Sequence, residues 1–120
     1  MHTPILHIVP SQAWERAQRE GTYRGDTLDA EGFIHFSSPD QVVRVANARF
    51  QGHTGLLLLI VDPEKLTSPL KFEPPFEDNE GNEVFPHLYG ALNLDAVIRV
   101  LEFPPNADGT FTLPNAPMML

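Results

Sequence analysis

The sequence contains no cysteine. This absence excludes a disulfide framework, an iron–sulfur centre, thiolate ligation of zinc and a cysteine nucleophile. Any metal ion bound by the chain would therefore need histidine and carboxylate ligands.

Long apolar runs are also missing. The longest uninterrupted one is Leu56 to Val61, which is far too short to cross a bilayer and is typical of a buried strand. The N-terminal segment has no basic leader, so it does not resemble a signal peptide. The chain has 120 residues, of which 42% are hydrophobic and 20% charged, as expected for one soluble, cytoplasmic domain without a membrane partner.

Basic residues are few. The chain has 8 Lys and Arg against 16 Asp and Glu, which gives a net charge of −8, and the sequence shows no cluster of cations. Binding to duplex nucleic acid depends on such clusters, so this partner is not expected. Glycine-rich phosphate loops, the dinucleotide fingerprint and the nucleophile elbow of hydrolases are absent as well. A free nucleotide held by backbone amides and a few side chains stays compatible with the sequence.

Apolar periodicity and turn residues divide the chain into short strands and two main helices. Ser11 is a suitable N-cap for the first helix, which Gly21 ends. The segment Ser38-Pro39-Asp40-Gln41 predicts a capping box for a second helix, which Gly52 ends. Strands are expected at residues 4–9, 33–36, 56–61, 69–73, 84–89 and 96–103, with a loop over 22–32 and an acidic loop over 74–83.

Two of these strands are expected at different places in a sheet. Pro86 cannot donate a backbone hydrogen bond, which confines the strand at 84–89 to an edge or a strand start. The aliphatic run at 56–61 predicts a strand covered on both faces. Residues 104–120 have a turn signal but no periodic pattern, so we expect a tail that packs on the domain at 1–103 or on a partner.

Three histidines, His7, His35 and His87, each lie in a short apolar segment. A single buried histidine usually satisfies both ring nitrogens within the protein, but three together indicate a pocket. Strand alternation places His35 and Ser37 on one face, beside a helix N-terminus that favours anions. Glu73 lies in a rigid, partly apolar segment and is either a base or the partner of a nearby cation.

Zinc and serine chemistry are the weaker interpretations of these residues. Imidazoles at three strand ends could converge on zinc, but no two of these histidines have the close spacing of a metal motif. We therefore assign no metal ligand. Ser37 precedes a capping box without an adjacent glycine, which favours a turn residue over a nucleophile.

Several segments together resemble the bacterial and plant family called domain of unknown function 952. They are LHIV, the Trp14 helix, EGFIHFS (Glu31 to Ser37), VANARF (Val45 to Phe50), LLLLIVD, FEP and FPHLYG (Phe85 to Gly90). The resemblance implies a fold related to the ADP-ribosyltransferase group, in which a split sheet surrounds a central cleft. In that group a first-strand histidine holds a ribose hydroxyl, a hydroxyl residue on a second strand supports the ligand, and a later glutamate polarises it.

Carried over by position, the resemblance implies His7 for the first role and Ser37 for the second. The third role stays open between Glu73 and the segment of His87 and Tyr89, because no glutamate begins a late core strand.

The resulting hypothesis is a small α+β domain with a central cleft and a histidine-lined pocket. We expect the pocket to bind an NAD- or ADP-ribose-like nucleotide, with ADP-ribosyl or phosphoryl transfer as the reaction class. The alternatives are a non-catalytic ligand- or protein-binding module and a histidine-based metal-dependent hydrolase. The candidate catalytic residues are His7, His35, Glu73 and His87, and the candidate ligand-binding residues are Ser37, Trp14, Asn47 and Tyr89.

Overall fold

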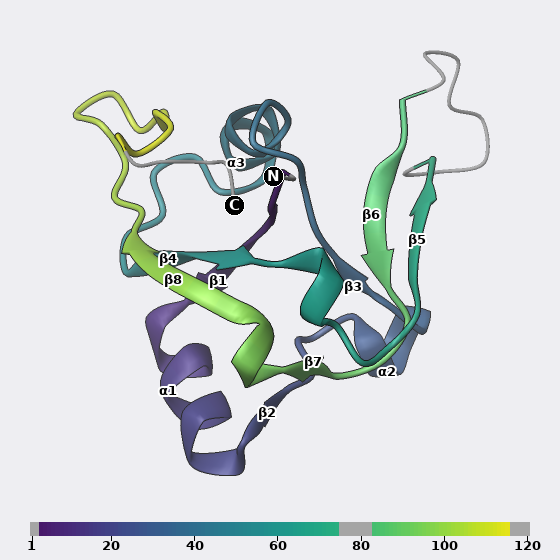
Figure 1. The fold of residues 1–120 in the computed structure, drawn as a ribbon. Coiled ribbons are helices and arrows are strands. Elements are labelled where there is room, and N and C mark those ends of the chain that lie inside the picture. Colours follow the sequence, from purple (N-terminus) through teal and green to yellow (C-terminus); the bar gives the residue numbers. More distant parts are fainter. Residues whose placement is uncertain (1–2, 75–82, 116–120) are drawn as a thin grey trace.

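A three-stranded antiparallel sheet forms the centre of the molecule (Figure 1). The computed structural model describes residues 3–74 and 83–115. The sheet has the order β1-β4-β8, with β1 at Ile5–Pro10, β4 at Leu56–Val61 and β8 at Val97–Glu102. The continuous aliphatic sequence of β4 explains its middle position, because only a strand buried on both faces tolerates apolar side chains throughout. The prediction for this strand is confirmed.

Alternating residues of the central sheet contribute to two separate hydrophobic cores. Leu59 and Val61 of β4 belong to one core, while Leu58 and Ile60 belong to the other. The first core contains buried side chains of α1 (Ser11–Glu20), and the second those of α3 (Val42–Arg49). In Figure 1 these helices lie on opposite sides of the sheet.

Helix α1 follows β1 without a loop. Its N-cap is Pro10, not Ser11 as predicted, and no side chain caps it. The amide of Ser11 instead donates to the carbonyl of Gly55 at 2.9 Å, which ties the start of the helix to the start of β4. Gly21 ends the helix as predicted, in a left-handed conformation with φ 81° that glycine adopts without strain.

A second antiparallel sheet has the order β3-β6-β5, with β3 at Ile34–His35, β6 at Phe85–Leu88 and β5 at Leu70–Glu73. Pro86 was predicted to lie on an edge strand or at a strand start. The edge position is wrong, because β6 is the middle strand, whereas Pro86 is the second residue of β6 and so lies close to its start. The Pro86 carbonyl accepts from Phe36 N at 2.9 Å, so its backbone faces β3 at the point where β3 has just ended. Only one ladder bond is lost there.

A single β-bridge joins the two sheets. Leu6 N donates to Ser37 O at 2.7 Å, and Ser37 N donates to Leu6 O at 2.8 Å. This bridge places the end of β3 against the outer edge of β1. Residues of the histidine-containing segments are thereby brought together.

The segment predicted as a loop at 22–32 contains two short elements. Strand β2 (Thr22–Tyr23) pairs with β7 (Leu92–Asn93), and α2 covers Leu28–Glu31. Such brief elements lack a detectable period, so their turn-rich sequence suggested only a loop. Two 3₁₀ turns, η1 (Pro63–Lys65) and η2 (Leu94–Ala96), complete the described elements.

Helix α3 begins at Val42, three residues after the predicted first position. Gln41 Oε1 does accept from Ser38 N at 3.0 Å, which is one half of the capping box. The other half is missing because the Gln41 backbone amide donates to the Ser38 backbone carbonyl at 3.0 Å and not to Ser38 Oγ, which itself donates to Asp40 at 2.5 Å. The helix ends at Arg49, before the predicted stop at Gly52.

Residues 104–115 follow β8 and contact α3. Phe111 is buried in the second core, where its ring stacks on Phe103 at 4.9 Å between centroids. Its amide donates to Asn47 Oδ1 at 2.7 Å. Residues 116–120 of the tail, and residues 75–82 of the acidic loop, lie outside the described residues.

The predicted mixed α/β class is confirmed, with antiparallel sheets and the three helices α1, α2 and α3 in the described parts of the chain. Within residues 3–74 and 83–115, no helix has both the length and the apolar character needed to span a membrane.

Candidate functional site

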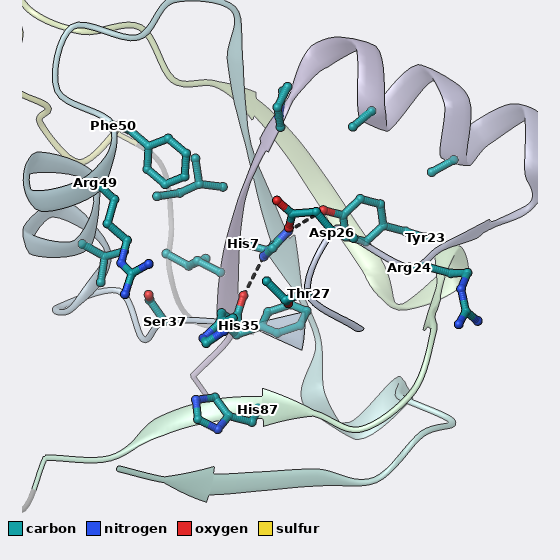
Figure 2. Close-up of a pocket in the computed structure, with 18 of the residues that line it drawn as sticks. His7, Tyr23, Arg24, Asp26, Thr27, His35, Ser37, Arg49, Phe50 and His87 are labelled. Atoms are coloured by element: carbon teal, nitrogen blue, oxygen red, sulfur yellow. Dashed lines mark hydrogen bonds between the residues drawn. The ribbon is translucent and has the colours of Figure 1, made fainter. Parts of the chain in front are cut away.

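A pocket of about 1130 Å³ opens along the outer edge of β1. Its walls come from β1, α1, the segment at 22–29, the end of β3, and α3, with further contacts from residues 83–87. The pocket is slightly larger than the range of about 300–1,000 Å³ that is usual for small-molecule sites. His7, His35, Ser37 and His87, all singled out in the sequence, line it together (Figure 2).

His7 occupies the centre of the pocket wall with both ring nitrogens bonded. Nδ1 donates to the His35 carbonyl at 2.6 Å, because a carbonyl oxygen can only accept. Burial lowers the pKa of His7 to about 4, so the ring is neutral near pH 7. Nε2 therefore accepts from the hydroxyl of Tyr23 at 2.7 Å, as the dashed line in Figure 2 shows.

Tyr23 and Asp26 enclose His7 on one side. Burial, with the charge of Asp26 as a second cause, raises the pKa of Tyr23, so Tyr23 keeps its proton for His7. The Asp26 carboxylate also raises the pKa of His7, but burial lowers this pKa by a larger amount. Figure 2 shows Asp26 beside the His7–Tyr23 pair, where it is one of the four acidic residues that line the pocket.

Ser37 and Arg49 lie on the other side of His7, near α3. Ser37 is 6% exposed, yet its hydroxyl borders the pocket. Figure 2 shows the Arg49 side chain reaching from α3 toward Ser37. Neither side chain has a polar partner in the described ranges, so both are available to a ligand.

Arginines converge on this pocket although the protein is acidic. Five of the 8 basic residues line it, and they include every Lys and Arg of residues 1–60. Three of them form ion pairs with pocket carboxylates: Arg16 with Glu20, Arg24 with Asp29, and Arg44 with Glu83. Arg19 and Arg49 make no ion pair within the described residues. This cluster was not predictable from the sequence, because the five arginines come from α1, from α3 and from the turn after β2.

Glu73, His87 and Tyr89 form a second group behind the pocket wall. His87 Nδ1 donates to Glu73 Oε1 at 2.9 Å, and the Tyr89 hydroxyl donates to the same oxygen at 2.5 Å. These two hydrogen bonds hold the pKa of Glu73 below its usual value, so Glu73 is an ionised acceptor. Of the three, only His87 lines the pocket.

The His87 and His35 side chains connect the two groups. Their rings lie 5.3 Å apart between centroids, edge against face. His35 Nε2 lies 3.2 Å from Glu31 Oε1, and the Phe33 ring packs against both His87 at 4.1 Å and His35 at 4.9 Å between centroids.

Three of the four predicted ligand-binding residues lie outside the pocket. Trp14 is 8% exposed and packs in the first core with Ala17, because its position on α1 faces the sheet. Asn47 bonds the tail at Phe111, so its amide is engaged away from the pocket. Tyr89 is the third of these residues; its hydroxyl donates to Glu73 and its ring contacts Phe33.

A metal centre receives no support from the described residues. In residues 3–74 and 83–115, no three histidine or carboxylate side chains are grouped so that they could hold a metal ion. His7 and His87 are separated by His35, and each uses a ring nitrogen on a protein acceptor.

The chain is similar to known proteins in both sequence and fold. Residues 8–100 match the family described as "Protein of unknown function (DUF952)". The chain belongs to this family. The crystal structure of protein CC0527 from Caulobacter crescentus is 34% identical, with a TM-score of 0.81 over 92% of this chain and 95% of that one. The solution structure of the same protein is 33% identical, with a TM-score of 0.69 over 91% of each chain.

No curated protein matches the sequence. The match to the family model confirms the family that the sequence motifs predicted. The similarity to CC0527 covers nearly the whole length of both chains.

Proposed function

We propose that the pocket binds an NAD- or ADP-ribose-like nucleotide. The observation that carries this proposal is the local reversal of charge. The whole chain has a net charge of −8, whereas the pocket contains five arginines and four acidic residues, which sum to +1 and leave −9 for the rest. Such a concentration of guanidinium groups favours a phosphorylated ligand, because arginine donates two parallel hydrogen bonds to phosphate oxygens.

Arg49 and Ser37 are the proposed phosphate contacts. Neither has a protein partner in the described parts of the chain, so a ligand needs to displace nothing in order to bind them. Arg16, Arg24 and Arg44 are each already paired with a carboxylate. They would therefore contribute mainly to the electrostatic potential of the pocket.

The sugar would bind near His7, as the resemblance to the ADP-ribosyltransferase group implies. Because Nε2 of His7 already accepts from Tyr23, a ribose hydroxyl has two routes. It can donate to the free lone pairs of the Tyr23 oxygen, or it can replace the tyrosine as the donor to His7. The two sheets joined by one bridge at Leu6 and Ser37 support the split-sheet arrangement that this resemblance implies.

ADP-ribosyl transfer is the reaction class that we propose for this site. In such a transfer nicotinamide leaves the ribose C1 with the bonding electron pair, and an acceptor nucleophile that loses its proton forms the new bond to C1. Positive charge develops on the sugar in between, and a nearby carboxylate stabilises it. Glu73 was the sequence-based candidate, but it lies behind His87 and does not line the pocket. Asp26, which lies beside His7 and Tyr23, is the better candidate (Figure 2).

Isothermal titration calorimetry with ADP-ribose and NAD tests the binding. Arg49→Gln should weaken both ligands by about tenfold or more, the effect of losing one charge-assisted hydrogen bond. Arg99→Gln is the matched control, because Arg99 is exposed on β8 outside the pocket and its loss changes the net charge equally. Adenosine, which lacks phosphate, should bind less tightly than either ligand. Equal weakening by the two variants, or equal affinity for adenosine, would contradict the proposal.

A further inference from the structure

His87 carries a buried ring nitrogen without a partner. The residue is 2% exposed, and among the described residues its Nε2 is the one buried side-chain nitrogen or oxygen with no hydrogen bond. Burying a polar atom in this way costs free energy, so it is seldom left uncompensated. Because His87 lines the pocket, the missing partner can come from a bound ligand.

The surroundings fix which ring nitrogen is available. Glu73 is an ionised acceptor, so His87 Nδ1 must carry the proton of their 2.9 Å hydrogen bond. Tyr89 holds the same carboxylate oxygen and keeps Glu73 in place. In the neutral imidazole, Nε2 is then an acceptor that points its lone pair away from Glu73.

Phe33 and His35 restrict what can reach this nitrogen. Phe33 stacks nearly parallel on the His87 ring, with an interplanar angle of 19°, and so holds the plane in which the Nε2 lone pair lies. His35 lies edge to face at 5.3 Å, and its side chain is 40% exposed. In the described ranges its ring bonds only Glu31, at 3.2 Å, so His35 can move aside more easily than Phe33.

We infer that His87 Nε2 is a hydroxyl-accepting subsite, whose ligand is a sugar phosphate that donates one O–H to this nitrogen while its phosphate binds the arginine side of the pocket. The inference rests on the proposed function for the phosphate contacts but does not need an adenine or a dinucleotide. Glu73 is a positioning residue here, because it sets the His87 tautomer and does not touch the ligand.

The test combines imidazole ¹⁵N NMR with titration of ribose 5-phosphate. In the free protein, the Nε2 signal of His87 should have the chemical shift of an unprotonated nitrogen and the Nδ1 signal that of a protonated one. Adding ribose 5-phosphate should shift the Nε2 signal, while the same concentration of inorganic phosphate should leave it unchanged. A protonated Nε2 in the free protein, or no response of the Nε2 signal to ribose 5-phosphate, would overturn the inference. The partner of Nε2 would then be water.

Substitutions separate the subsite from the fold. His87→Asn keeps a donor near Nδ1 for Glu73 but has no atom at the Nε2 position, whereas His87→Gln can place an amide oxygen there. We expect ribose 5-phosphate to bind about tenfold more weakly to His87→Asn and to recover most of its affinity in His87→Gln. His53→Gln is the control, since His53 lies outside the pocket.

The same measurements distinguish this inference from the proposed function. If ADP-ribose and NAD fail to bind while ribose 5-phosphate shifts the His87 signal, the nucleotide assignment is wrong and the subsite stands. If the nucleotides bind with no difference between wild type and His87→Asn, the proposed function stands and the subsite is wrong. Glu73→Gln should change the Nδ1 signal of His87 in the free protein, an effect that an unrelated surface carboxylate would not produce.

Discussion

Lowering the pH from 7.5 to 5 should destabilise the fold through His7. Burial lowers the pKa of this imidazole from 6.5 in the unfolded chain to about 4 in the folded protein. The unfolded state therefore binds more protons between these two values, and the stability contributed by neutral His7 is lost as the pH falls below 6.5.

The size of the effect follows from proton linkage. For pKa values of 6.5 and about 4, the free energy of unfolding at pH 5 is lower than at pH 7.5 by about 2 kcal/mol. Because His7 lines the pocket, solvent there screens part of the charge of the protonated ring. The loss of about 2 kcal/mol is therefore an upper value. The physical reason is that protonation of His7 would place a charge in a desolvated position.

Urea unfolding at several pH values, followed by circular dichroism, measures this loss. The wild type is compared with His7→Gln, which cannot titrate in this range, so that the contributions of the other histidines cancel in the difference. The variant should be less stable at pH 7.5 but should lose about 2 kcal/mol less than the wild type on going to pH 5. Parallel curves for the two proteins would refute the reasoning, because His7 would then titrate equally in the folded and unfolded states.

Three other substitutions test the structural account. Tyr23→Phe should lower the free energy of unfolding by about 1–3 kcal/mol, because His7 Nε2 loses its donor, and an unchanged midpoint in urea would show that this bond is dispensable. Asn47→Ala should cost about 1–2 kcal/mol, because the Phe111 amide loses its acceptor, and faster proteolysis after residue 103 should accompany the loss; a tail equally resistant in both proteins would count against it. Gly90→Ala should lower the free energy of unfolding by about 1–3 kcal/mol, because the φ angle of Gly90 is 155° and the added Cβ would lie 2.3 Å from Ser68 Oγ. An unchanged midpoint of thermal unfolding would contradict this expectation.

The parts of the fold that the sequence predicts are those with a strong period. The alternation in residues 5–9 and the aliphatic run of β4 indicate strands because their side chains must be buried on known faces. The position of β6 was not predictable in this way. A proline usually excludes a middle strand, and only the early end of β3 makes Pro86 acceptable there.

The site shows the same division. His7, His35, Ser37 and His87 were recognisable because polar side chains in apolar strands are unusual. Tyr23, Asp26 and the arginines were missed, since they lie in a two-residue strand, in turns and on helices, and only tertiary contacts bring them together. Trp14 was a candidate ligand-binding residue, but the α1 stripe that carries it faces the core.

Mapping of ADP-ribose by ¹H–¹⁵N NMR tests the central claim most directly. A saturable titration should shift the backbone amides of Tyr23, Ser37 and Arg49 on the pocket walls, and it should leave those of Arg99 and the other β8 residues unchanged. Absence of any saturable shift at millimolar ADP-ribose, or shifts confined to residues outside the pocket, would contradict the assignment of this pocket as a nucleotide site.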